Sequence, residues 1–401
     1  MVHGRRHARV VPRYPVVARL LSPLRRLRGL GEVWGTIKPL LRDSDPSHER
    51  EAEHHAPWGA YHIAINSVAG VAWQAATALL QRALRIQPVM SDLAAAVLHE
   101  AEDYAEDHGR WRLGIHAMLG TLYLRLLDVD RERTIALKPR VFPTPTTDGE
   151  YFDAAWEGLI LHWNLGTEGF NLLRNEYVHA VVRLAAPGHQ GDDALRTDDR
   201  LAVDLVCRYC SGRLDYGEPD HLLERFESAV PPAVFAAVIS AFGRTKVEDI
   251  PKDGSEQWTQ RALDFVDRRL EHHRETGAAA ACEKELRGLV RRLADPLYDP
   301  VEILSRLERV IGLVGRFPRH SRILEELARH AASHPAAVLR VLERIAESDA
   351  EPWEFGLRAK ELNKALRTIE SVGDLDLRRR VRVVVNRLSA RGIRLDSWDD
   401  L

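Results

Sequence analysis

Apolar residues recur at spacings of three and four along almost the whole chain, and this pattern constrains the fold more than any other feature. Between Asp299 and Val314, six aliphatic residues fall on one side of a helix: Ile303, Leu304, Leu307, Val310, Ile311 and Val314. Arg306, Glu308 and Arg309 fall on the other sides. One apolar stripe of this kind is typical of an amphipathic helix that packs on one face. Because we find no convincing two-residue alternation of the kind that predicts strands, the sequence predicts an all-α protein.

Helix start and stop signals divide the chain into roughly fifteen helices of about 12–20 residues. Ser67 precedes Val68 as a candidate N-cap, and prolines suited to a first helical turn follow Asp299 and His334. The uncharged stretch 63–81 is punctuated by polar residues, so we predict a buried core helix there and no transmembrane segment.

One helix pattern occurs twice at an offset of 35 residues. Segments 299–310 and 334–345 share a proline at the second position, equivalent apolar positions and the triplet Leu-Glu-Arg, and residues 376–388 echo them loosely. Another helix, 321–333, lies between the first two, so the unit is a helix pair. Helix pairs at this period are typical of stacked modules, because each pair buries its apolar stripe only against its neighbours. Since the rest of the chain lacks so clean a period, we predict an irregular HEAT/TPR-like helical-repeat solenoid.

Charge separates an N-terminal segment from a longer body. The first 42 residues contain ten Lys or Arg and a single acid, and the next fifteen contain five acids and three His. We therefore predict a basic amphipathic arm and an acidic, His-rich connector over 1–57, followed by a helical-repeat domain over 58–401. Candidate boundaries within that domain lie near 187–197 and 245–254.

The basic arm leaves three alternatives open. Aliphatic residues line one side of it and arginines occupy the others, while Pro23 breaks the register. Such a segment either docks on the body or stays a flexible tail, contacts nucleic-acid phosphates, or lies on an anionic membrane surface. The candidate phosphate contacts are Arg19, Arg25, Arg26 and Arg28.

Overall composition excludes two classes of protein. With 57 Lys or Arg against 59 Asp or Glu, the chain is not a polycation that coats nucleic acid along its length. Its three cysteines exclude a disulfide-stabilised scaffold and favour a reducing, cytoplasmic location.

No motif in the sequence predicts catalysis or a resident cofactor. Cys207 and Cys210 form a CxxC pair, but a structural zinc site needs four ligands, and packing inside a helix explains both thiols. The His-Glu pair at 48–49 lacks the second histidine of a zinc-protease motif, whose position is Ala52. The acids of residues 100–107 are interpreted as a solvated helix face. We therefore expect a non-enzymatic protein without a metal or cofactor.

Aromatic residues concentrate between positions 111 and 177. Buried wedges between helices are one explanation, and a ligand or peptide groove on the concave side of the solenoid is the other. The candidate groove residues are Trp111, Tyr151, Trp156, Trp163 and Tyr177.

Four short features follow one another along the chain. They are Ala64–Gly70 at the start of an apolar helix, Ala154–Leu159 followed by Leu173, Arg174 and Tyr177, then Ser333–Ala337, and finally Leu388–Gly392. In the first, Ser67 is placed to cap the helix and Gly70 to admit a close neighbouring helix. Together the features resemble the C-terminal helical-repeat region of very large bacterial STAND-NTPase-type proteins of antiphage defence. The resemblance implies a region that senses a foreign protein, but the NTPase and effector portions of those proteins have no counterpart here.

These observations favour a protein-binding helical-repeat scaffold or sensor, a subunit in bacterial antiphage defence, whose partner is a protein. Two alternatives stay open. One is a helical-repeat protein that binds nucleic acid through its arginine-rich arm. The other is an all-α enzyme with an unrecognised site, which requires a pocket where several carboxylates and histidines converge.

Overall fold

Every regular element in the described residues of the computed structural model is a helix, as the apolar spacing predicts. The described residues are 29–86, 91–107, 111–162, 165–184, 194–230, 234–235, 238–239, 255–315, 322–348, 359–393 and 395. The chain divides into two compact units, Met1–Arg200 and Leu201–Leu401, called here the N-terminal and C-terminal units. This division lies close to the candidate boundary at 187–197, whereas the candidate at 245–254 falls outside the described residues.

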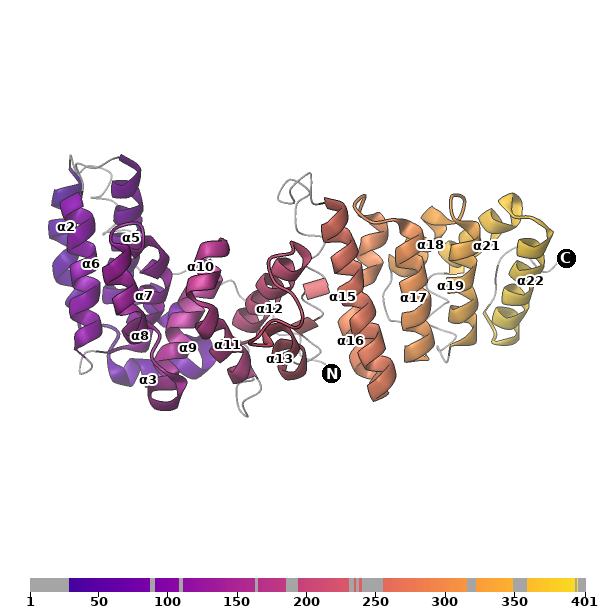
Figure 1. The fold of residues 1–401 in the computed structure, drawn as a ribbon. Coiled ribbons are helices and arrows are strands. Elements are labelled where there is room, and N and C mark those ends of the chain that lie inside the picture. The colour runs from indigo at the N-terminus through magenta and orange to yellow at the C-terminus, as the bar shows by residue number, and fades with distance from the viewer. Residues whose placement is uncertain are drawn as a thin grey trace, which may run out of the picture. The chain divides into compact units, whose positions relative to one another are not determined.

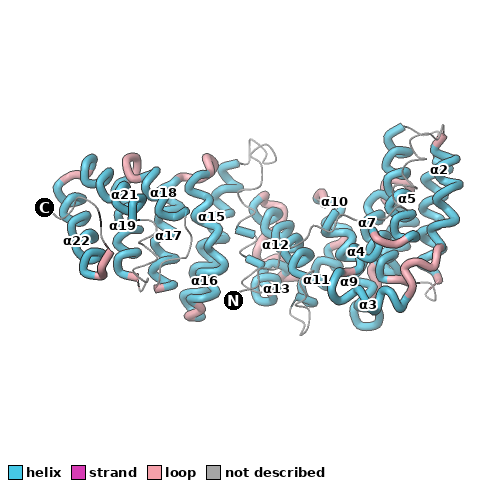
Figure 2. Tube along the Cα trace, turned by 180° about the vertical axis from the view of Figure 1, so that it is seen from behind, coloured by secondary structure: helices cyan, strands magenta, loops and turns pink. Residues whose placement is uncertain are grey.

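The N-terminal unit is built around one buried helix, α7 (Leu113–Leu126), of which eleven of fourteen residues are buried. Helix α7 packs against α4, α5, α8 and α9 (Figures 1 and 2). The other elements of the unit are α2 (Leu30–Ile37), η1 (Lys38–Arg42), α3 (His48–Trp58), α4 (Ala60–Ile65), α5 (Val68–Ile86), α6 (Ser91–Glu106), α8 (Arg131–Val141), α9 (Pro145–His162), α10 (Thr167–Leu172) and α11 (Arg174–Leu184). Several are shorter than the 12 residues expected, so the described helices are more numerous than predicted.

Close packing of α7 on α9 depends on two glycines, Gly120 of α7 and Gly158 of α9, each of which lies against the backbone of the other helix. A Cβ on Gly120 would lie 1.9 Å from the carbonyl oxygen of Ala155, and a Cβ on Gly158 would lie 1.8 Å from that of Ala117. The Thr121 hydroxyl oxygen lies 3.0 Å from the carbonyl oxygens of both Ala117 and Gly158. The two helices therefore meet at backbone contact distance, which no larger residue at either glycine permits.

The uncharged stretch 63–81 is two helices, α4 and α5, and not the single helix that we expected. Between them, the Ser67 hydroxyl accepts the backbone N–H of Gly70 at 3.2 Å and donates to the carbonyl oxygen of Ala64 at 2.9 Å. Ser67 thus caps α5 as predicted, and its local hydrogen bonds replace the helical bonds that would have joined the two helices. A Cβ on Gly70 would lie 2.1 Å from the Ala64 carbonyl oxygen, so the predicted close approach is also confirmed.

The expected connector belongs to the folded unit. Residues 48–58 form α3, which packs on α4, and the described part of the expected arm, 29–42, forms α2 and η1, which pack on α5. The hydrophilic composition of 43–57 predicted a connector outside the fold. Helix α3 is nevertheless held in the unit by a buried carboxylate, Glu51, whose hydrogen-bond partners lie more than 60 residues later in the chain. The candidate phosphate contacts lie outside the described residues; they are Arg19, Arg25, Arg26 and Arg28.

The C-terminal unit places its later helices in two rows. In one row α15 (Ser255–Thr276), α17 (Pro300–Val314), α19 (Pro335–Glu347) and α22 (Leu375–Ala390) pack in succession, and in the other η6 (Arg287–Ala294), α18 (Arg322–His330) and α21 (Ala359–Val372) do the same (Figure 1). The unit also contains most of α12 (Ala194–Cys210), together with α13 (Leu222–Ala229) and α16 (Ala279–Leu286).

Both copies of the 35-residue sequence pattern begin a helix at their proline. Pro300 starts α17 behind Asp299, whose carboxylate accepts the Val301 N–H at 2.9 Å. Pro335 starts α19 behind His334, whose side chain makes no capping hydrogen bond. Proline is tolerated at this position because the first helical N–H groups have no intrahelical partner. The two helices that share the pattern pack directly on each other.

Candidate functional site

The aromatic residues predicted to line a groove lie in the core of the N-terminal unit. Trp111, Trp156 and Tyr177 are 2%, 4% and 0% exposed, and Tyr151 is half-buried. The ring of Trp156 meets that of Tyr177 edge-on, with centroids 4.9 Å apart. Rings buried to this extent cannot contact a partner unless the helices separate, so the groove prediction is wrong for these three residues, which are wedges between helices. Trp163 lies outside the described residues.

A buried carboxylate closes the start of α7. Glu51 of α3 is 3% exposed and accepts the backbone N–H groups of Leu113 and Gly114 at 3.0 and 2.8 Å. Arg112 at the N-cap position makes no side-chain capping bond, so Glu51 satisfies these donors from a different helix. Burial raises the pKa of Glu51 although the two hydrogen bonds oppose that rise.

A second carboxylate acts in the same way at α4. Glu157 of α9 accepts the backbone N–H of Ala60 at 3.0 Å, next to Gly59, which has a φ of +76°. Glu157 and Gly158 belong to the segment Ala154–Leu159, one of the features that carry the resemblance described above. In this chain, the segment therefore forms helix junctions within the unit.

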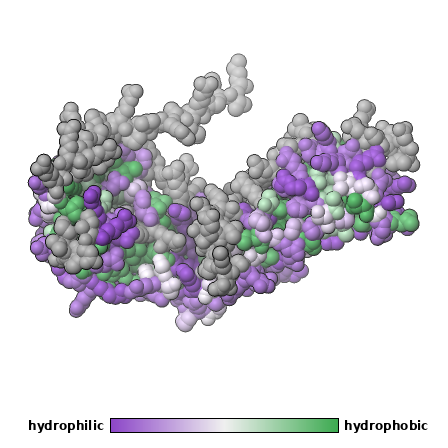
Figure 3. Space-filling view, turned by 90° about the horizontal axis from the view of Figure 1, so that it is seen from above, coloured by the Kyte–Doolittle hydropathy of each residue, from purple (hydrophilic) through white to green (hydrophobic). Residues whose placement is uncertain are grey.

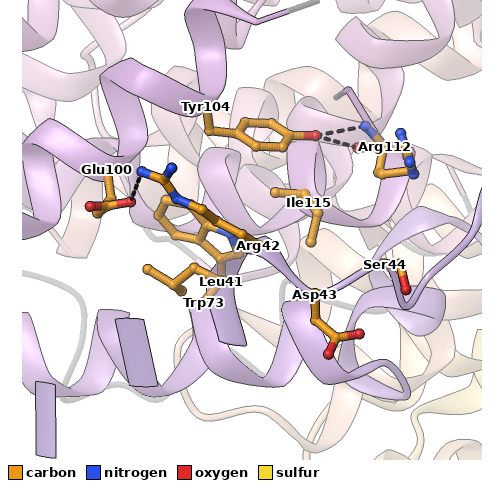
Figure 4. Close-up of a pocket in the computed structure, with 9 residues that line it drawn as sticks. All are labelled: Leu41, Arg42, Asp43, Ser44, Trp73, Glu100, Tyr104, Arg112 and Ile115. Atoms are coloured by element: carbon orange, nitrogen blue, oxygen red, sulfur yellow. Dashed lines mark hydrogen bonds and ion pairs between the residues drawn. The ribbon is translucent and has the colours of Figure 1, made fainter. Parts of the chain in front are cut away.

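A pocket of about 180 Å³ lies between η1, α5, α6 and the start of α7 (Figure 4). Buried apolar side chains of Leu41, Trp73 and Ile115 form part of its wall. Across from them, the Tyr104 hydroxyl oxygen accepts the backbone N–H of Arg112 at 2.6 Å. The remaining lining residues are Arg42, Asp43, Ser44 and Glu100.

The charged side of this pocket is a paired cluster. The Glu100 side chain is 4% exposed, with Lys38 Nζ and Arg42 Nη2 both at 2.9 Å from its carboxylate, and Arg42 also contacts Asp103 at 3.0 Å. Burial by itself raises the pKa of Glu100, but the hydrogen bonds and charges of Lys38 and Arg42 outweigh it and lower that pKa. Two further acids of α6 pair with arginines of α8. The acidic row is therefore solvent-accessible as expected at Asp103, Glu106 and Asp107, but Glu100 is buried and several of the acids are ion-paired.

The pocket lining does not form a catalytic constellation. Both of its carboxylates are engaged, Glu100 with two cations and Asp43 with the backbone N–H of Asp45 at 2.9 Å. None of its lining residues is Cys or His, the groups that most often supply a nucleophile or a base near neutral pH.

The CxxC pair lies within α12. Burial raises the pKa of Cys207 to about 12 and that of the fully buried Cys210 well above its ordinary value, so both thiols stay protonated near neutral pH. Across the described ranges, no group of three or more His, Cys, Asp or Glu side chains is placed to hold a metal ion. No helix in the part of the chain that the structure describes combines the length and apolar character needed to cross a membrane.

Arginine–carboxylate pairs, called here the arginine rungs, join successive helices of the row α15, α17, α19 and α22. Arg306 and Arg309 of α17 both contact Asp267 of α15, the first at 2.5 Å. Two arginines of α19 contact Glu308 of α17 at 3.2 and 3.8 Å. In each case, one carboxylate faces two arginines of the following helix.

The rungs continue to the last helix of the row. Arg380 of α22 donates two hydrogen bonds of 2.8 Å to the carboxylate of Glu343 in α19, and Arg387 contacts Glu347 at 2.6 Å. Glu308 and Glu343 are the glutamates of the two Leu-Glu-Arg triplets, 35 residues apart. The triplet shared by the two sequence segments therefore holds the same kind of contact in both.

The side of α22 that faces away from α19 carries apolar and cationic residues together. Helix α22 buries Val381, Val384, Val385 and Leu388. On its other side Leu375 and Val383 are 86% and 45% exposed, and Arg379 and Arg382 are exposed. These four residues are called here the outer face of α22. Hydrophobic residues are visible among hydrophilic ones on the surface of this unit (Figure 3).

Comparison of the chain with protein-family models gave no match. The same comparison with curated proteins and with solved structures also gave none.

Proposed function

We propose that the protein is an irregular HEAT/TPR-like helical solenoid that acts by binding another protein. The observation that supports this proposal best is the recurrence of the arginine rungs along α15, α17, α19 and α22. A row in which each helix is held by the next is the arrangement expected of stacked helix pairs.

Such a row supports recognition by surface rather than by chemistry. Stacked helices expose a long series of side chains on a rigid backbone. In this row, the arginines and carboxylates of the rungs are paired with neighbouring helices. In the pocket of the N-terminal unit, both carboxylates have partners. The protein would then act by shifting the state of its partner on binding.

The resemblance to STAND-NTPase-type proteins supports placing this binding in bacterial antiphage defence. We propose that this region acts as a sensor or scaffold in such a system. Among the described residues that carry the resemblance, Ser67, Gly70, Glu157 and Gly158 all make helix junctions. Such residues support a shared architecture, not a shared activity.

The experiment that tests this function separates protein from nucleic acid as the partner. The full chain is purified from bacterial cells before and after phage infection, with and without nuclease, and bound proteins are quantified by mass spectrometry. A protein that remains in stoichiometric amount after nuclease treatment supports the proposal. If instead nucleic acid is recovered, its affinity falls steeply with salt and deletion of residues 1–28, which leaves α2 and η1 in place, abolishes binding, the nucleic-acid alternative replaces the proposal.

A further inference from the structure

We infer that the outer face of α22 binds an amphipathic helix of a partner protein that carries a carboxylate between two apolar residues. This inference rests on the proposed protein-binding function and specifies both the surface and the chemistry of the partner.

The spacing of the outer face defines a stripe along α22. Leu375, Arg379 and Val383 are each four residues apart, so they follow one another on the same side of the helix. Arg382 lies one turn from Arg379 and next to Val383. Val372, the last residue of α21 and three residues before Leu375 in the chain, is also 52% exposed. Three of the six large hydrophobic side chains that are exposed in the described residues therefore lie on this stripe or just before it in the chain.

The rungs inside the same unit provide a model for the charge of the partner. Arg306 and Arg309, three residues apart on α17, both contact one carboxylate, that of Asp267 on α15. Arg379 and Arg382 have the same spacing on α22, and no carboxylate of the described chain lies within ion-pair distance of either. In the rungs the paired arginines face the preceding helix, whereas Arg379 and Arg382 lie on the side of α22 away from α19, so the matching carboxylate would come from a partner on that side.

Other occupants fit this surface less well. A second copy of α22 packed on the same face would set arginine against arginine, which is repulsive. Nucleic-acid phosphates would satisfy the two arginines but would leave the exposed Leu375 and Val383 without an apolar contact. A partner helix with an apolar residue, a carboxylate and a second apolar residue, each four apart, matches both the charges and the apolar positions.

The test uses the full chain and two synthetic helical peptides, measured by fluorescence anisotropy. One peptide carries Leu, Glu and Leu four residues apart, and in the other Lys replaces Glu. We expect the Glu peptide to bind, and the double variant Arg379→Glu/Arg382→Glu to weaken its binding roughly tenfold or more. The same variant should bind the Lys peptide more tightly than the unmodified protein does, because the charges then match again.

A matched control separates this face from a general effect of net charge. Arg82 and Arg85 on α5 are also exposed and three residues apart, and Arg82→Glu/Arg85→Glu makes the same change of charge in the N-terminal unit. This control should leave binding of the Glu peptide unchanged. Leu375→Ser/Val383→Ser should weaken that binding without changing the helical circular dichroism signal, because neither side chain is part of the core.

The inference is overturned if the unmodified protein binds the two peptides equally or binds neither, or if the α5 control loses binding as much as the α22 variant. These outcomes are independent of the purification experiment described above. A stoichiometric protein partner combined with failure of the peptide assay would leave the proposed function standing and remove only this surface.

Discussion

At the scale of single residues, the N-terminal unit depends on glycines that have no room for a side chain. Gly158→Ala places a Cβ 1.8 Å from the carbonyl oxygen of Ala117, so α9 must move away from α7. We expect a loss of about 1–3 kcal/mol or more in the free energy of unfolding, measured by chemical denaturation. Gly35→Ala is the matched control: Gly35 lies in α2 of the same unit with no atom within 4 Å of its added Cβ, so that variant should be neutral or slightly stabilising.

A second residue-scale prediction concerns the buried Glu51. Because burial raises its pKa, the folded protein holds this proton more tightly than the unfolded chain does, whose pKa is near the ordinary value of 4.5. The contribution of Glu51 to stability is therefore complete below that value and declines as the pH rises through the raised pKa of the folded state. Subtracting the free energies of unfolding of Glu51→Gln from those of the unmodified protein between acid and neutral pH should reveal this decline. An identical pH dependence in both proteins would show that Glu51 does not titrate as argued.

At the scale of elements, the rung between α19 and α22 should couple the two helices measurably. Arg380 donates two hydrogen bonds to Glu343, and the interaction raises the pKa of Arg380. A double-mutant cycle with Arg380→Ala and Glu343→Ala should give a coupling free energy of about 0.5–1 kcal/mol that decreases with salt, because both groups are partly solvated. The neighbouring Arg379→Ala combined with Glu343→Ala should give no coupling, and an equal value for both pairs would contradict the rung.

Elements with local signals could be predicted from the sequence, and those with distant partners could not. The cap at Ser67 and the helix starts at Pro300 and Pro335 depend on neighbouring residues, and they are confirmed. By contrast, Glu100 is held by cations about 60 residues away, and no local pattern distinguishes it from a solvated acid. The same applies to the aromatic groove, since ring spacing does not say which rings other helices will cover.

Among the candidate binding residues, too, those with a local sequence pattern could be predicted and those that depend on distant packing could not. The Leu-Glu-Arg triplets were visible in the sequence, and their glutamates became the acceptors of the rungs. The sequence analysis did not identify the outer face of α22, because which side of this helix is left exposed depends on how it packs on α19 and α21. Arg379 resembles any exposed arginine until the helices that pack beside α22 are known.

At the scale of the whole molecule, a stack of helices should lose structure locally, whereas a core shared by all helices should lose it everywhere. Leu388 of α22 is fully buried against its neighbours, and Leu388→Ala should cost about 2–5 kcal/mol of local packing. If each helix depends only on its neighbours, hydrogen exchange will then accelerate in α21 and α22 while α15 and α17 keep their protection. Leu307→Ala, in the middle of the row, should spread the loss to both sides of α17. Equal loss of protection across the whole C-terminal unit in both variants would mean that its helices share one cooperative core, and the proposed solenoid would then be wrong.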